Sequence, residues 1–144
     1  CRIFNTYGPR MHKNDGRVMS NFIIQALKNE PITIYGEGLQ TRSFCYVDDL
    51  VLGLINFMNT DSNIIGPINI GSNQEISIKD LAIKIIKLTN SKSEIKFLKP
   101  LLDDPMQRKP DLSLAKKVIN WSFDVNLEDG INSTINFFKE KIDN

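Results

Sequence analysis

Arginine is used sparingly in this chain, where five of the 18 lysine and arginine residues are arginines. Arg42 follows a turn at Gly36 and Gly38, and Arg108 lies in the stretch QRKPD, three residues before Asp111. A guanidinium is a rigid, forked donor that keeps its charge, so two of them in one site suit the forked oxygens of a diphosphate. The sequence therefore predicts an anion site built on Arg42 and Arg108, in which Asp111 accepts hydrogen bonds from ribose hydroxyls.

Each of these side chains also has a plain structural explanation. On its strand context alone, Arg42 is a surface charge, and Arg108 in a loop rich in lysine and proline is a solvated one. Asp111 is placed to cap a helix expected to begin near residue 113. Arg17 opens another expected helix, where a cation is unfavourable to the helix dipole, and this favours a functional reason for it.

Other familiar catalytic constellations are missing from the sequence. Gly36 and Gly38 have no third glycine and no following helix, so they are not a dinucleotide-binding turn. His12 is the one histidine, and the two cysteines have no metal-ligand spacing, so no metal site is expected. No motif supports Ser/His/Asp catalysis. The catalytic groups of any enzyme that contains this chain are therefore expected outside it.

The composition is that of an ordinary globular domain. The chain has 144 residues, of which 41% are hydrophobic and 24% charged. A net charge of +1 predicts neither a nucleic-acid-binding protein nor a membrane-surface protein, and no apolar run is long enough for a membrane span. Cys1 and Cys45 are expected to be reduced, which favours a cytoplasmic location.

Alternating strands and helices position these residues. Strands are predicted at 1–5, 32–35, 41–46, 67–70 and 94–98, and helices at 17–29, 49–58, 78–89, 113–119 and 127–141. The stretch Ser77–Asp80 is similar to a capping box, and Asn120 is suited to a left-handed helix end. The alternation indicates an α/β fold. Because the chain opens directly into a strand and has few strands, we expect the C-terminal part of a larger α/β protein.

Six segments together resemble a known enzyme family. They are RIFNTYGPRM (2–11), NDGRVMSNFI (14–23), PITIYGEGLQTRSFCYVDDL (31–50), GPINIG (66–71), DDPMQRKPDLSLAK (103–116) and NWSFDVNLEDGI (120–131). In order and spacing they resemble the C-terminal part of UDP-glucuronate decarboxylases, which are extended short-chain dehydrogenase/reductase enzymes of the NAD-dependent epimerase/dehydratase type. The choice of decarboxylase depends mainly on residues 4–22. One departure is Asn120, where relatives usually have glycine, and a left-handed asparagine makes it a mild one.

The resemblance implies a fold and a reaction. Residues 1–144 would be the last Rossmann strands and the smaller nucleotide-sugar-binding domain, without the glycine-rich turn and the Tyr-x-x-x-Lys pair. In the family, bound NAD oxidises C4 of UDP-glucuronate, the β-keto acid loses CO2, and the returned hydride gives UDP-xylose. We therefore expect this chain to supply UDP-sugar binding, to be inactive alone, and to form a homodimer when full length.

The same resemblance implies roles for ten residues. The substrate-binding set is Asn5, Arg17, Val18, Tyr35, Gln40, Arg42, Arg108 and Asp111, and the cofactor-binding set is Thr6 and His12. Asn5 would contact the diphosphate region, and Tyr35 would line the uracil pocket. Thr6 and His12 would lie near the nicotinamide side of NAD.

Other functions stay open on the sequence. A dTDP-glucose 4,6-dehydratase or a nucleotide-sugar 4-epimerase would share most of these segments. A non-catalytic nucleotide-sugar-binding module is an alternative of another class, because catalytic residues are missing from the chain. A glycine-rich turn and a Tyr-x-x-x-Lys pair upstream in the gene would favour an enzyme.

Overall fold

The computed structural model of the protein describes residues 1–61 and 63–142. Its strands are β1 (Arg2–Ile3), β2 (Thr6–Tyr7), β3 (Ile32–Tyr35), β4 (Thr41–Ser43), β5 (Cys45–Tyr46), β6 (Asn69–Ile70), β7 (Glu75–Ser77), β8 (Ile95–Leu98) and β9 (Gln107–Arg108). Its helices are α1 (Val18–Leu27), α2 (Val47–Met58), α3 (Ile78–Thr89), α4 (Ser113–Ile119) and α5 (Leu127–Ile142). The predicted α/β fold is confirmed.

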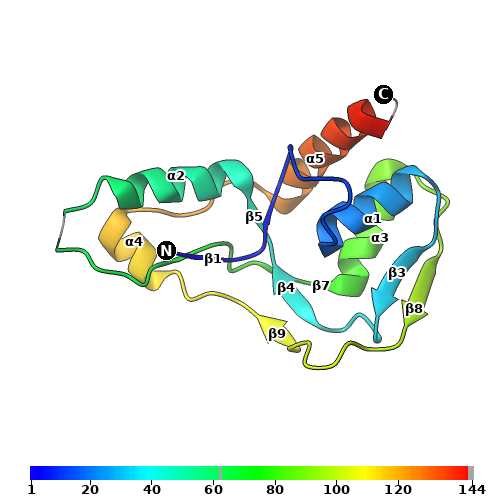
Figure 1. Cartoon of the computed structure of the whole chain (residues 1–144), viewed down its shortest axis with the longest axis horizontal. Helices are drawn as coiled ribbons and strands as arrows, with labels where there is room; N and C mark the ends of the chain where they lie inside the picture. Colours follow the sequence, from blue (N-terminus) through cyan, green and yellow to red (C-terminus); the bar gives the residue numbers. More distant parts are fainter. Residues whose placement is uncertain (62, 143–144) are drawn as a thin grey trace.

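The strands form small sheets that are mostly parallel. β1 pairs with β6, β2 with β5 and β3 with β8, each in parallel. The remaining sheet has the order β7-β4-β9, in which β4 is antiparallel to β7 and parallel to β9. This sheet lies between the two ends of the molecule (Figure 1).

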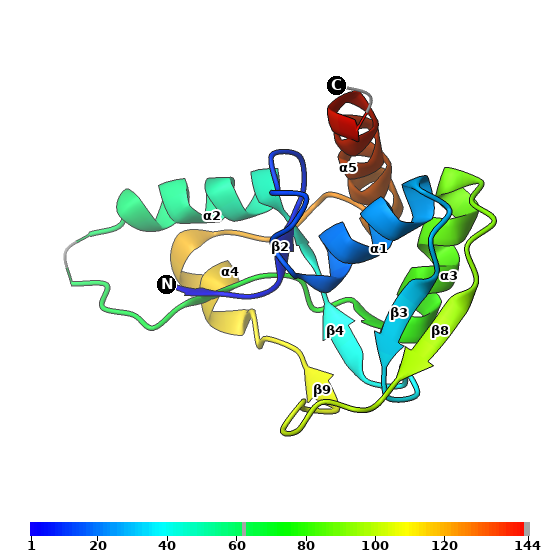
Figure 2. The ribbon, with the colours of Figure 1, turned by 45° about the vertical axis from the view of Figure 1, so that its right-hand side comes forward.

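Two hydrophobic cores lie on either side of the chain at residues 44–46, which include β5. One core lies among α1, α3, α5 and β3, and the other among α2, α4 and β6, at opposite ends of the molecule (Figures 1 and 2). Phe44 and Tyr46 pack into the first core, while Cys45 between them packs into the second. This alternation is what a strand requires, because successive side chains point to opposite faces.

The ends of α3 and α4 follow the sequence predictions. Ser77 Oγ accepts a hydrogen bond from the N–H of Asp80 at 3.0 Å and donates to the Asp80 carboxylate at 2.7 Å. Ser77 therefore caps the start of α3 as predicted, while the Asp80 carboxylate binds the Ser77 hydroxyl instead of the Ser77 backbone N–H of a complete capping box. Asn120 has a φ of 47° at the end of α4, which confirms its predicted left-handed conformation.

Several strands differ from the sequence prediction. The single strand predicted at 1–5 ends at Ile3, because Asn5 has a φ of 31° and breaks the extended chain before β2. The strand predicted at 41–46 is divided at Phe44. The strands β7 and β9 were not predicted, since two or three residues are too few to show alternation.

Asp49 joins α2 to the segment before α5. Its carbonyl oxygen accepts the indole N–H of Trp121 at 2.8 Å, and its buried carboxylate accepts the N–H groups of Asp124 and Val125. These contacts satisfy a carboxylate that would otherwise be costly to bury. The neighbouring Cys45 is buried and forms no disulfide, and its burial raises the pKa of the thiol to about 12.

Within residues 1–61 and 63–142, no helix is both long enough and apolar enough to cross a membrane. The same residues contain no group of three or more histidine, cysteine, aspartate or glutamate side chains arranged to hold a metal ion.

Candidate functional site

A cavity of about 300 Å³ lies between the start of α1, the end of β3 and the sheet β7-β4-β9. In Figure 2 the start of α1 lies above β4. Eight of the ten residues predicted to bind substrate or cofactor line it: Asn5, Thr6, Arg17, Val18, Tyr35, Gln40, Arg42 and Arg108. The fold thus brings together residues that are up to about a hundred positions apart in the sequence.

Arg42 and Arg108 lie side by side on one wall of this cavity. They are partners in the parallel register of β4 and β9, so their side chains project to the same face of the sheet. Arg42 is only 7% exposed, so the explanation of Arg42 as a surface charge is wrong. Its Nη1 donates to the carbonyl oxygen of Thr41 at 2.7 Å, and its Nη2 lies 2.5 Å from a carboxylate oxygen of Asp104.

Glu75 holds the two strands that carry these arginines. Its carboxylate accepts hydrogen bonds from Thr41 Oγ1 on β4 at 2.7 Å and from Gln107 Nε2 on β9 at 2.8 and 3.0 Å. Lys109, just after β9, places its Nζ 3.3 Å from the same carboxylate. Hydrogen bonds from Thr41 and Gln107 lower the pKa of Glu75, and the hydrogen bond and positive charge of Lys109 lower it further. Glu75 therefore fixes β9 beside β4.

Arg17 lies on the opposite wall, immediately before α1. Its guanidinium forms an ion pair of 2.7 Å with Asp15 and donates to the carbonyl oxygen of Thr6 at 3.4 Å. Ser20 Oγ also donates to Asp15. Partial burial opposes the ionisation of Asp15, but the hydrogen bonds from Ser20 and Arg17 lower its pKa overall. Asp15 thus offsets the unfavourable position of a cation at the start of a helix.

Thr6 has a buried hydroxyl that lacks a partner. Among the buried side-chain polar atoms of residues 1–61 and 63–142, Thr6 Oγ1 is the one without a hydrogen bond. Thr6 lines the 300 Å³ cavity and a second one of about 580 Å³, bounded by residues 7–11 and the start of α2. Buried hydroxyls are almost always bonded, so this atom fits a hydrogen bond to a bound group.

His12 and Asp111, the two remaining predicted residues, lie outside these cavities. His12 is exposed, and its Nδ1 accepts the N–H of Asn14 at 3.2 Å. Asp111 is also exposed, and its carboxylate accepts the N–H of Ser113 at 2.9 Å at the start of α4. That hydrogen bond lowers the pKa of Asp111. The N-cap of α4 is Leu112, so Asp111 lies one residue before the capping position predicted for it and binds the first residue of the helix from there.

Tyr35 and Gln40 lie where the cavity widens. Both line the 300 Å³ cavity and an adjoining one of about 550 Å³. Gln40 Nε2 donates to the carbonyl oxygen of Tyr35 at 3.1 Å, and the Tyr35 side chain is 45% exposed. An aromatic ring at such a mouth offers a face on which a planar base can stack.

Sequence reasoning missed two residues of this site, Asp104 and Glu75. Asp104 lies 62 positions after Arg42, and Glu75 meets Gln107 across 32 positions. The acidic pair before Arg108 in DDPMQR was visible in the sequence as a signal, but nothing local showed which arginine it would meet.

Comparison with known proteins first defines the class. Residues 1–71 match the sequence profile of the NAD dependent epimerase/dehydratase family. It superposes with a TM-score of 0.90 and 35% identity on UDP-glucuronic acid 4-epimerase from Bacillus cereus, solved with UDP-glucuronic acid and NAD, covering 97% of this chain and 44% of that one. For UDP-glucose 4-epimerase from Thermotoga maritima, solved with UDP-glucose, the TM-score is 0.91, the identity 27% and the coverages 98% and 45%.

Comparison with curated sequences then finds more similar relatives within this class of protein. The chain is 52% identical over 143 residues to UDP-glucuronic acid decarboxylase 1 of Xenopus tropicalis, covering 99% of this chain and 34% of that protein. It is 53% identical over 131 residues to UDP-glucuronic acid decarboxylase 3 of Arabidopsis thaliana, covering 91% and 38%. The chain is thus a homologue of UDP-glucuronic acid decarboxylases and spans about a third of their length.

Proposed function

We propose that this chain forms the nucleotide-sugar-binding part of an NAD-dependent UDP-glucuronate decarboxylase. The observation that carries the proposal is the register pairing of Arg42 with Arg108 on one wall of a cavity. Two neighbouring guanidinium groups suit the charge and the forked oxygens of a diphosphate. The identity of 52% to a UDP-glucuronic acid decarboxylase supports the choice of sugar nucleotide.

The residues of this chain would bind and orient the substrate. Arg42 and Arg108 would hold the diphosphate, and the exposed ring of Tyr35 would lie against the uracil at the wider end of the cavity. Asn5 is fixed by a hydrogen bond from its side-chain amide to the carbonyl oxygen of Ser43 at 3.0 Å, so it presents its side chain from a set position. Holding the sugar in one orientation accounts for a large part of enzymatic rate enhancement.

NAD, when bound, would supply the acceptance and return of the hydride at C4 of the sugar. The residue of this chain that we assign to it is Thr6, which lines the 300 Å³ and 580 Å³ cavities and has a buried hydroxyl without a partner. The sequence has no glycine-rich dinucleotide turn and no Tyr-x-x-x-Lys pair, so other contacts and the catalytic acid–base groups would come from outside residues 1–144.

Substitution of the arginines tests the proposal. In the protein as its gene encodes it, Arg42→Ala or Arg108→Ala should raise KM for UDP-glucuronate by an amount equivalent to about 1.5–3 kcal/mol, the usual range for charge-assisted hydrogen bonds. The Kd for NAD should change much less. Arg2→Ala is the matched control, because Arg2 is exposed on β1 and lines none of these cavities. Equal losses for substrate and NAD would contradict the assignment.

A nucleotide-sugar 4-epimerase is the second candidate, favoured by the TM-score of 0.90 to the UDP-glucuronic acid 4-epimerase. Product analysis separates the two reactions, since decarboxylation releases CO2 and yields UDP-xylose, whereas epimerisation retains the carboxylate and yields the C4 epimer. Turnover of a dTDP-sugar would instead indicate a 4,6-dehydratase. Binding of UDP-glucuronate without turnover, with NAD present, would indicate a non-catalytic module.

A further inference from the structure

Asp104 occupies part of the cavity that is assigned above to the substrate diphosphate. One carboxylate oxygen lies 2.5 Å from Arg42 Nη2, and the other accepts a hydrogen bond from Gln40 Nε2 at 3.5 Å. The Arg42 side chain is 8% exposed and that of Asp104 31%. The carboxylate therefore reaches a buried guanidinium from the solvent side, by the path that an incoming anion would take.

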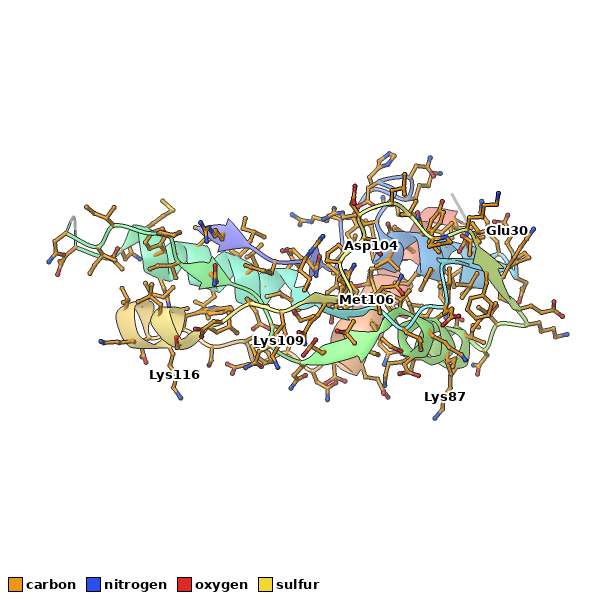
Figure 3. All side chains as sticks on the ribbon, turned by 90° about the horizontal axis from the view of Figure 1, so that it is seen from below. Glu30, Lys87, Asp104, Met106, Lys109 and Lys116 are labelled. Atoms are coloured by element: carbon orange, nitrogen blue, oxygen red, sulfur yellow. The ribbon has the colours of Figure 1, made fainter. Side chains whose placement is uncertain are left out.

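Asp104 belongs to a segment, residues 99–106, that connects β8 to β9. Its ends are fixed by backbone hydrogen bonds, from Gly36 N–H to Leu98 and from Thr41 N–H to Met106. Between these ends, Leu102 is 95% exposed, and the side chain of Asp104 forms an ion pair with Arg42. Figure 3 shows where Asp104 and Met106 lie on this segment. This ion pair is thus an attachment of an otherwise exposed segment to the cavity wall.

A carboxylate and a phosphate compete for the same donors. A guanidinium buried without a counter-ion is costly, so Asp104 stabilises Arg42 when no anion is bound. A ligand that binds Arg42 through its own oxygens must first break this ion pair. A diphosphate carries more charge than a carboxylate and also meets Arg108 on the neighbouring strand, whereas a single carboxylate gains little by the exchange.

We propose that Asp104 is an internal competitor for Arg42, which lowers the affinity of the cavity for all anions and so restricts binding to ligands with a diphosphate. The inference rests on the proposed function, because it takes Arg42 as a diphosphate donor. Displacement of Asp104 also frees residues 99–106 from Arg42 and opens the connection between the 300 Å³ cavity and the adjoining 550 Å³ cavity, both of which Asp104 lines.

Calorimetric binding of UDP and uridine to the protein as its gene encodes it tests the inference. Asp104→Asn should bind UDP about fivefold more tightly or better, the scale of about 1 kcal/mol for removal of one competing ion pair. Uridine affinity should stay unchanged, since uridine carries no phosphate. Asp104→Ser, a second neutral replacement, should show the same direction.

Asp103→Asn is the matched control. It changes the net charge by the same amount in the same segment, and Asp103 is exposed and makes no ion pair or side-chain hydrogen bond within residues 1–61 and 63–142. Its φ of 62° is one that asparagine tolerates well. UDP affinity in this variant should change less than about twofold, as expected for an exposed surface charge that solvent and salt screen.

Three outcomes separate this inference from the proposed function. If Arg42→Ala weakens UDP binding but neither Asp104 variant strengthens it, the competition is refuted and the assignment of Arg42 stands. Weaker UDP binding in both Asp104 variants would mean that Asp104 orients Arg42 for the ligand, and this too would overturn the inference. If Arg42→Ala leaves UDP binding unchanged, the proposed function of the cavity itself fails.

Discussion

Arg42 and Arg108 are direct partners in the register of the parallel strands β4 and β9. This relationship places the two backbones one strand spacing apart, about 4.8 Å, with both side chains on the same face of the sheet. It exists only because a two-residue strand, β9, is held beside β4. The geometry of the proposed diphosphate site therefore depends on whatever fixes β9, and Glu75 is the residue whose contacts do so.

Removal of the Glu75 carboxylate should weaken substrate binding at a distance. We expect Glu75→Ala to raise KM for UDP-glucuronate about three- to tenfold while kcat changes little, since a shift of Arg108 removes binding energy that is equal in the ground state and the transition state. Glu75→Gln keeps one acceptor oxygen and should restore part of the affinity. Glu94→Ala is the control, because Glu94 is exposed just before β8, far along the chain from these contacts. A KM unchanged in Glu75→Ala would refute the positioning role.

Acid should destabilise the folded chain through its paired carboxylates. Hydrogen bonds and cationic neighbours lower the pKa of Glu75 and Glu128 below their ordinary value of 4.5, and those of Asp15 and Asp111 below 3.8. Between the folded and unfolded pKa values the unfolded chain binds more protons, so this stability is present above the ordinary values and lost as the pH falls through the folded ones. Urea unfolding should show a free energy that declines steadily below pH 4.5.

The variant Glu128→Gln tests the predicted pH dependence of stability. Glu128 accepts a hydrogen bond of 2.7 Å from Lys84, which contributes to its lowered pKa. Replacement of the Glu128 carboxylate by an amide should reduce the slope of the unfolding free energy against pH below pH 4.5. At high salt the unfolding free energy should stay almost unchanged, because surface ion pairs are screened. A slope identical to that of the parent chain would show that this pair is not formed.

The sequence predicted elements whose signals are local, and it missed those that depend on distant contacts. The bounds of α3 were predicted correctly at 78–89, because Ser77 caps its start and Asn90, with a φ of 52°, ends it. The convergence of Arg42 and Arg108 was anticipated from residue type and resemblance. The Asp104 ion pair was not, because no periodicity links residues 62 positions apart.

Gly130, in the first turns of α5, should not tolerate a side chain. A Cβ there would lie 2.1 Å from the Tyr7 hydroxyl, which donates to the carbonyl oxygen of Leu127 at 3.2 Å. Gly130→Ala should therefore lower the free energy of unfolding by about 1–3 kcal/mol, the usual cost of overpacking, despite alanine's higher helix propensity. Asn132→Ala, exposed on the same helix, is the control and should be neutral or slightly stabilising. A Gly130→Ala chain as stable as the parent would contradict the close contact.

Thr6 offers a prediction in which stability and cofactor binding change in opposite directions. Thr6→Val keeps the shape of the side chain and removes a buried hydroxyl that has no partner. Without ligand, the variant should therefore be more stable than the parent by about 1 kcal/mol or more, since an unsatisfied buried group costs about that much. If the hydroxyl serves NAD, as proposed, the same change should weaken NAD binding about tenfold, the loss of one hydrogen bond of about 1.4 kcal/mol. Thermal unfolding with and without saturating NAD measures both effects, and Thr6→Ser, which keeps the hydroxyl, should retain NAD binding. A gain in stability with unchanged NAD affinity would leave the hydroxyl as a packing defect and end its assignment to the cofactor.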